Sequence, residues 1–161
     1  MTDLTRISDQ MLADRLAITD VLYRYASTID RFDFDGTRAT LADDLWAQYG
    51  LADPVEGAEA VVGFIKTFCE TCVWQHHMLS VYHVDISGDR ATALVYHTSH
   101  QGFEPDPELC HVLVGRYRNE LIRTPDGWKI SKLVLELVWA ERRHDPSGYL
   151  ADAGGRGPAA P

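Results

Sequence analysis

The sequence contains little cysteine: three residues in a chain of 161. An odd and small number of cysteines is not typical of a disulfide framework. Cys69 and Cys72 form a C-x-x-C pair, but a structural zinc needs two more ligands at a familiar spacing. A thioredoxin-like pair begins a helix, whereas this pair follows a predicted one. We expect Cys69, Cys72 and Cys110 to be buried as small apolar residues, with no metal and no cofactor.

Runs of one charge and long apolar runs are also missing. The formal net charge is −9 and no lysine/arginine cluster is present, so neither nucleic acid nor an anionic membrane is an expected partner. No apolar run approaches the roughly 20 residues of a membrane span. The first ten residues lack the apolar segment of a signal peptide. A cytoplasmic protein is the expectation.

What is present suits one domain. Hydrophobic residues make up 45% of the chain and charged residues 24%, as in ordinary globular proteins with a single core. Residues 145–161 are rich in glycine, alanine and proline, a composition that disfavours a packed core. We therefore predict a domain over residues 1–144 and a flexible tail over residues 145–161.

The first half of the chain has helical periodicity. Apolar residues recur at helical spacing from about Ser8 to Arg31, with Ser8 or Asp9 as the N-cap. A short helix is predicted after Asp35, a short strand at residues 45–49, and a third helix at residues 57–70.

From Val73 onward the apolar period changes to two. Four long strands are predicted, at residues 73–86, 91–103, 109–122 and 128–140. The short polar connections between them indicate antiparallel hairpins. Helices followed by a strand meander predict an α+β fold, a cone-shaped curved antiparallel sheet wrapped around three N-terminal helices. A pocket is expected in its apolar interior.

Several motifs occur in a family-specific order. They are Y-R-Y-A-S-T-I-D-R-F-D-F-D at residues 23–35, Tyr49, Q-H at residues 75–76, Y-H-T-S-H-Q at residues 96–101 and D-G-W-K-I at residues 126–130. Together they resemble the SnoaL-like branch of the nuclear transport factor 2-like superfamily, which includes scytalone dehydratase. The resemblance covers residues 9–143 and implies the cone fold.

The resemblance also implies an active site. The aspartate and the two strand histidines of the dehydratase match Asp30, His76 and His100, and one of its two water-binding tyrosines matches Tyr49. Ile29 stands where the second tyrosine would be. The implied function is a cofactor-independent lyase or isomerase, dehydratase- or cyclase-like, that uses Asp/His acid–base chemistry on a small apolar or aromatic oxygenated substrate.

The residues themselves leave the histidine assignment open. Successive strand side chains point to opposite faces, so only one of His76 and His77 can face the pocket. His97 and His100 present the same alternative, and a register slip of one residue exchanges the roles. Asp30 could instead face solvent or pair with an arginine.

Aromatic and thioether side chains are the expected substrate-binding wall: Tyr25, Trp46, Phe64 and Met78. The run K-L-V-L-E-L-V-W at residues 132–139 is apolar on both strand faces, which favours a homodimer through the outer face of the sheet.

Fold does not fix function. The alternatives are a non-catalytic module that binds a small molecule or a partner protein, and a small β-subunit of a dioxygenase. Asp30 within hydrogen-bond reach of a pocket histidine would favour catalysis, whereas Asp30 in a surface ion pair would favour a binding module.

Overall fold

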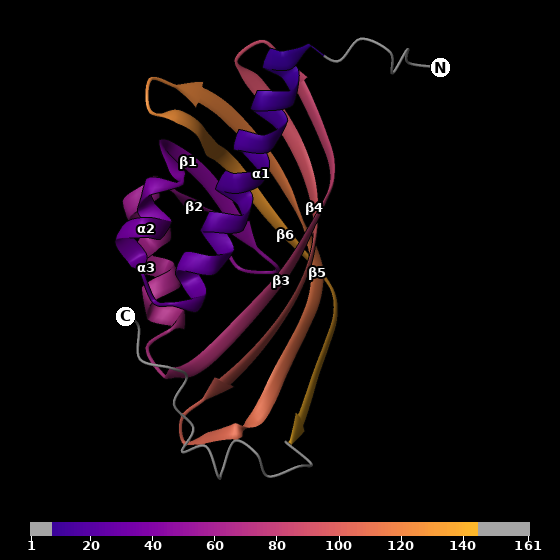
Figure 1. Cartoon of the computed structure of the whole chain (residues 1–161). Coiled ribbons are helices and arrows are strands. Elements are labelled where there is room, and N and C mark those ends of the chain that lie inside the picture. The colour runs from indigo at the N-terminus through magenta and orange to yellow at the C-terminus, as the bar shows by residue number, and fades with distance from the viewer. Residues whose placement is uncertain (1–7, 145–161) are drawn as a thin grey trace.

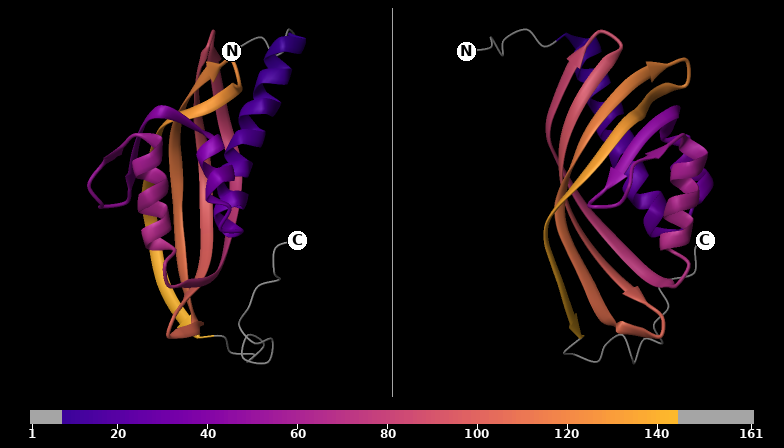
Figure 2. Two further views of the ribbon diagram at one scale, coloured as in Figure 1. Left: turned by 90° about the vertical axis from the view of Figure 1, so that its left-hand side faces the viewer. Right: turned by 180° about the vertical axis from the view of Figure 1, so that it is seen from behind.

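A computed structural model describes residues 8–144 of the chain. It is an α+β structure in which one six-stranded sheet curls around the helices, which lie inside its curve (Figures 1 and 2). The predicted tail at residues 145–161 lies outside the described residues. None of the helices within residues 8–144 has both the length and the apolar character needed to cross a membrane.

Helix α1 (Asp9–Asp30) begins where the sequence predicts. Ser8 is its N-cap, and the side-chain oxygen of Ser8 accepts a hydrogen bond from the backbone N–H of Met11, which satisfies one of the free amide groups of the first turn. Ile18 and Leu22 lie on its buried face. The amphipathic pattern of this helix therefore packs one face onto the sheet.

Shorter elements follow α1. Helix α2 (Phe34–Ala39) is capped by the carboxylate of Asp33, which accepts from the amide of Gly36. Strands β1 (Leu41–Tyr49) and β2 (Val55–Glu56) form a small hairpin, and helix α3 (Ala58–Phe68) follows.

Four long strands complete the chain: β3 (Cys72–Ser87), β4 (Arg90–Phe103), β5 (Asp106–Thr124) and β6 (Gly127–His144). Each pairs with the next in antiparallel fashion. The predicted period-two segments are therefore confirmed; β3 and β4 exceed their predicted bounds by one residue at an end, and β5 and β6 by up to three and four residues.

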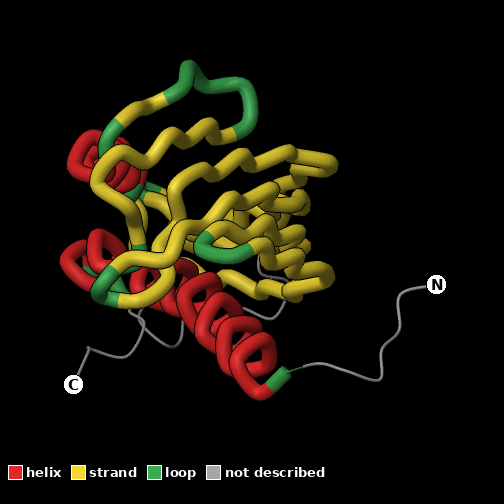
Figure 3. Tube along the Cα trace, turned by 90° about the horizontal axis from the view of Figure 1, so that it is seen from above, coloured by secondary structure: helices red, strands yellow, loops and turns green. Residues whose placement is uncertain are grey.

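The sheet has the order β2-β1-β6-β5-β4-β3, and β1 runs parallel to β6. The expectation of an antiparallel sheet holds for β3 to β6, while β1 joins the last strand in parallel. The connection from β1 to β6 passes through α3 and the whole meander, which is long enough for a parallel pair. Seen from above, helices lie on one side of the sheet (Figure 3).

An ion pair fastens the first turns of α1 to the far end of the sheet. Both carboxylate oxygens of Asp14 accept from the guanidinium of Arg123, each at 2.7 Å, and one also accepts from the indole N–H of Trp128 at 3.1 Å. Arg123 holds the pKa of this buried carboxyl well below its usual range. Charge-assisted, two-point bonding of this kind fixes orientation as well as distance.

The outer face of the sheet carries an apolar row. Strand register places Met78, Thr98, Val114 and Trp139 side by side across β3 to β6. Met78 is 57% exposed and Trp139 is 58% exposed, and the exposed rings of Tyr82 and Tyr96 pack edge to face nearby. Exposed apolar surface of this extent is usually covered by a partner. We propose that a second copy of the chain covers it.

The proposed dimer is tested by analytical ultracentrifugation at micromolar concentration. The wild-type protein is expected at twice the 18.1 kDa of one chain, and Trp139→Asp is expected to shift it to the monomer by placing a charge in an apolar interface. Leu51→Asp is the control, because Leu51 is fully exposed in the loop between β1 and β2. A wild-type protein that sediments only as a monomer would refute the proposal.

Candidate active site

A cavity of about 190 Å³ lies between the helices and the inner face of the sheet. One wall comes from α1 and α3, and the other from β3 to β6. Its lining is mostly apolar, with a few polar side chains, which is the usual composition of a small-molecule site. The polar residues that line it are Tyr25, Tyr49, Gln75, His77, His97, Ser99, Gln101 and Tyr117.

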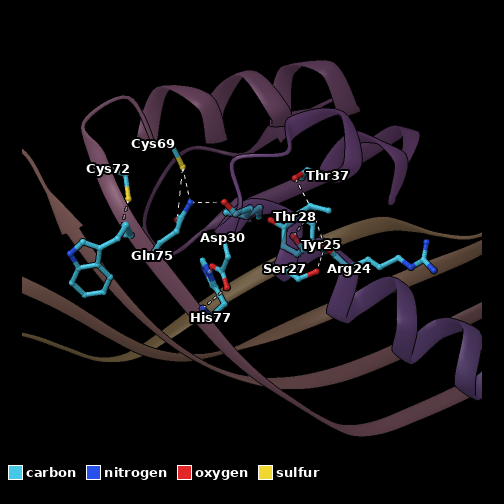
Figure 4. Close-up of polar contacts among 12 residues, drawn as sticks. Arg24, Tyr25, Ser27, Thr28, Asp30, Thr37, Cys69, Cys72, Gln75 and His77 are labelled. Atoms are coloured by element: carbon cyan, nitrogen blue, oxygen red, sulfur yellow. Dashed lines mark hydrogen bonds and ion pairs between the residues drawn. The ribbon is translucent and has the colours of Figure 1, made fainter. Parts of the chain in front are cut away.

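The last residue of α1 meets the sheet beside this cavity. One carboxylate oxygen of Asp30 lies 2.5 Å from Nδ1 of His77, and the other accepts from the backbone N–H of His77 at 2.9 Å. Both side chains are largely buried. Figure 4 shows the carboxylate and the imidazole facing one another between helix and strand. The predicted hydrogen bond between Asp30 and a strand histidine is therefore present.

This bond sets the tautomer of His77. An ionised carboxylate only accepts hydrogen bonds, so Nδ1 of His77 must carry the proton that is donated to Asp30. The other ring nitrogen, Nε2, is then the basic one, on a residue that lines the cavity. An aspartate–histidine pair of this geometry is suited to proton abstraction.

Gln75 fixes the position of the helix end. Its amide nitrogen donates to the backbone oxygen of Ile29 at 2.6 Å and contacts the sulfur of Cys69 at 3.7 Å (Figure 4). Gln75 therefore joins α1, β3 and the end of α3. The end of α1 that carries Asp30 is therefore held against β3 by Gln75 as well as by His77.

The preference for His76 and His100 as the pocket histidines is wrong. His76 pairs with His100 across β3 and β4, and their rings stack at 6.4 Å on the outer face of the sheet. The inner positions belong to His77 and His97, whose ring centroids lie 5.4 Å apart. Because strand side chains alternate, residues one or three positions apart lie on opposite faces, so His76 and His100 cannot share the inner face with His77 and His97.

His97 is the second imidazole of the cavity. Its ring packs edge-on against Tyr117 at a centroid distance of 5.0 Å. Burial, with a smaller contribution from the neighbouring His77, lowers the pKa of His97 to about 4. His97 is therefore neutral near pH 7, where it can accept or donate a hydrogen bond without carrying charge.

Two tyrosines of the cavity lining are joined through their hydroxyl groups. The hydroxyl oxygens of Tyr25 and Tyr49 are 2.6 Å apart, and the ring of Tyr49 stacks on Phe64 at 5.2 Å. Burial raises the pKa of both phenols, so both are protonated. When Tyr25 donates to Tyr49, the hydroxyl hydrogen of Tyr49 becomes available for a substrate oxygen.

Two of the four predicted substrate-binding residues line the cavity. Tyr25 and Phe64 do so, and Trp46 and Met78 do not. Trp46 packs under the ammonium of Lys132 at 5.5 Å, on the other side of β1, and Met78 lies on the outer row described above. Both assignments were wrong because residue type was used without strand parity.

Several lining residues were not predicted. Gln75 and Gln101 occur in the quoted motifs but were given no role, and Ser99 and Tyr117 were not singled out. The signal for β4 was present in the sequence, since Ala91, Ala93 and Val95 are apolar at alternate positions and lead directly to His97, Ser99 and Gln101 on the same face.

The prediction that all three cysteines are buried holds for Cys69, whereas Cys72 and Cys110 are only half-buried. Burial raises the pKa of the Cys69 thiol, and that of Cys72 to about 12. Such thiols are poor nucleophiles and poor metal ligands at neutral pH. Within residues 8–144, no group of three or more metal-binding side chains comes together.

The buried His97 predicts how stability depends on pH. The pKa of His97 is about 4 in the folded protein against 6.5 for an ordinary histidine. Between these two pH values the unfolded chain therefore binds more protons than the folded protein. The free energy of unfolding should therefore fall as the pH falls from 6.5 to 4, by up to about 3 kcal/mol from this residue. Urea titrations over this range should show a clearly smaller pH dependence in His97→Asn. The exposed control His76→Asn should keep the wild-type dependence, and an unchanged dependence in both would contradict the prediction.

Comparison with known proteins identifies the family to which the chain belongs. A model of the SnoaL-like domain matches residues 10–134. The uncharacterized protein Rv2910c of Mycobacterium tuberculosis is 26% identical over 133 residues, which are 82% of this chain and 90% of that protein.

Two solved structures share the fold at lower identity. A provisionally named scytalone dehydratase from Novosphingobium aromaticivorans has a TM-score of 0.78 at 16% identity and covers 86% of this chain and 93% of its own. The hexachlorocyclohexane dehydrochlorinase LinA-type3 from Novosphingobium barchaimii has a TM-score of 0.76 at 17% identity, with 84% and 94% covered. The match of the family model over most of the domain shows that the chain belongs to the SnoaL-like domain family.

Proposed function

We propose that the protein is a cofactor-independent lyase or isomerase that acts on a small, mostly apolar or aromatic oxygenated molecule. The observation that carries this proposal is the two-point contact between Asp30 and His77 at the edge of a mostly apolar cavity. A carboxylate that orients an imidazole in this way is a recurrent general base.

The surroundings of the pair support proton abstraction next to a carbonyl group. Nε2 of His77 accepts the proton, and the carboxylate of Asp30 stabilises the imidazolium that forms. The hydroxyl of Tyr49 donates to the carbonyl oxygen as negative charge develops there. Tyr25 donates to Tyr49 and orients it.

An elimination can follow from the same groups. The electrons of the broken C–H bond form the enolate held by Tyr49. When the enolate collapses, the carbon–oxygen bond to a β-hydroxyl breaks, the imidazolium of His77 returns its proton to that oxygen, and water leaves. If the proton is instead returned to another carbon, the outcome is an isomerisation. The site thus provides one base and one oxyanion donor for either reaction.

The names of the two structural neighbours also favour elimination. A dehydratase and a dehydrochlorinase both remove a small group and a proton from adjacent carbons. At such low sequence identity the structural likeness shows the shared fold alone, so the reaction remains part of the proposal.

The test uses the neutral aromatic β-hydroxy ketone that loses water to give benzalacetone. Its dehydration is followed through the absorbance of benzalacetone, the conjugated product. His77→Gln is expected to lower kcat/KM by about 10²- to 10⁴-fold, because the general base is lost. Its matched control is His76→Gln, one residue away on the outer face, which should keep the wild-type rate. Asp30→Asn should lower the rate at least about tenfold with the fold intact.

The tyrosine pair gives a graded prediction. Tyr49→Phe removes the proposed oxyanion donor and should lower kcat by about 10²-fold, as loss of such a donor does. Tyr25→Phe removes only its orienting partner and should have a smaller effect on kcat. Equal rates in the wild-type protein and in both His77→Gln and Asp30→Asn would refute the catalytic proposal and favour the non-catalytic binding module.

A further inference from the structure

The inner face of β4 carries three polar side chains in a row. His97, Ser99 and Gln101 are 3%, 1% and 4% exposed, and all three line the cavity. Within residues 8–144, no protein group lies within hydrogen-bond distance of the ring nitrogens of His97, Oγ of Ser99 or Oε1 of Gln101. Buried polar atoms normally have partners, and leaving them without one costs stability. Three such residues in one row point to a ligand that supplies the hydrogen bonds.

Register shows where each of them acts. Ser99 pairs with His77, directly opposite the proposed base, and Gln101 pairs with Gln75. The amide of Gln75 is already used by Ile29 and Cys69, so Gln101 supplies the amide that remains available. Two residues along a strand separate Gln101 from Ser99 by about 6.6–6.8 Å, roughly the width of a six-membered ring with its substituents.

The charge of the lining restricts the ligand further. Among the described residues that line the cavity there is no lysine or arginine. Asp30 is the nearest carboxylate, at the base. A ligand carboxylate or phosphate would therefore be buried without a cationic partner, which is costly. Leu113, Leu135 and Leu137 continue the same inner face of the sheet with apolar side chains, and Phe64, Ile65 and Phe68 of α3 line the facing wall.

We propose that this row is the specificity strip for a neutral, single-ring substrate with oxygen functions on opposite sides of the ring. One oxygen lies at the reacting end, between Ser99 and Tyr49, and the other is bound by the amide of Gln101. A cavity of about 190 Å³ suits this size, since a cavity of about 150 Å³ holds benzene. The identity of the reacting end rests on the proposed function, whereas the recognition by Gln101 is a binding property that requires no turnover.

Three para-substituted acetophenones test the strip, and the hydroxyl and methyl compounds among them are matched in size. They are para-hydroxyacetophenone, para-methylacetophenone and para-carboxyacetophenone, titrated by NMR of isotope-labelled protein. The hydroxyl compound should bind about tenfold more tightly than the methyl compound, because one added hydrogen bond to a buried amide is worth about that factor. The carboxylate compound should bind more weakly than either.

Two variants locate the effect. Gln101→Met keeps the side-chain length and removes the amide, so the hydroxyl-to-methyl ratio should fall to about one. Its Tm without ligand should be equal to or higher than that of the wild-type protein, because a buried polar group without a partner has been removed; a purely structural glutamine would give a lower Tm. Thr98→Val lies on the outer face of the same strand and should keep the wild-type ratio.

The outcomes separate this inference from the proposed reaction. Asp30→Asn should keep the hydroxyl-to-methyl ratio even where dehydration is lost. A preserved ratio with no catalysis would overturn the proposed reaction and support the strip. Equal binding of the hydroxyl and methyl compounds, a preference for the carboxylate compound, or no saturable binding of any of the three would overturn the strip.

Discussion

The site depends on one carboxylate that bonds to two parts of the same residue. Asp30 accepts from the imidazole of His77 and from its backbone N–H. The backbone bond fixes where the helix end meets β3, and the ring bond fixes which nitrogen is basic. A carboxylate placed in this apolar region without such donors would be costly, so the contact on which the proposed chemistry depends also stabilises the packing of α1 against β3.

The remaining polar groups of the cavity are neutral. Burial keeps His97 unprotonated and the tyrosines protonated near neutral pH. The field inside the cavity is therefore dominated by the Asp30–His77 pair. A neutral cavity with one carboxylate, paired to an imidazole, favours reactions in which charge forms and disappears within the substrate, because little else there would compete for a proton.

Local pattern was enough to predict most of the fold. The capped α1 and the four alternating segments are each specified by neighbouring residues, and their order implies the cone. The aspartate of the dyad was also predictable, since it ends an apolar helix face. The parallel pairing of β1 with β6 was not, because it joins segments that the whole meander separates.

The preference for His76 over His77 failed for a specific reason, whereas unbroken alternation along β4 already favours His97 over His100. Near the β3–β4 turn, Ile86 and Val84 face inward, but the register shifts between Val81 and His83. Beyond this irregularity the inward positions are odd-numbered, including His77. A count from the turn that assumes unbroken alternation therefore gives His76. A bulge of this kind depends on packing across the sheet and leaves little trace in a single sequence.

The attachment of α1 has a consequence for how such a site can diversify. This helix is tied to the sheet at both ends, by Asp14 to Arg123 and by Asp30 to His77. Helix α3, which contributes Phe64, Ile65 and Phe68 to the cavity, rests mainly on β1 and α2. The proposed reactive groups thus lie where α1 is fixed to the sheet, whereas α3 contributes much of the shape of the cavity. Exchange of side chains on α3 can change which molecule fits while the proton-transfer geometry stays the same, so substrate range and reaction type can evolve independently in this scaffold.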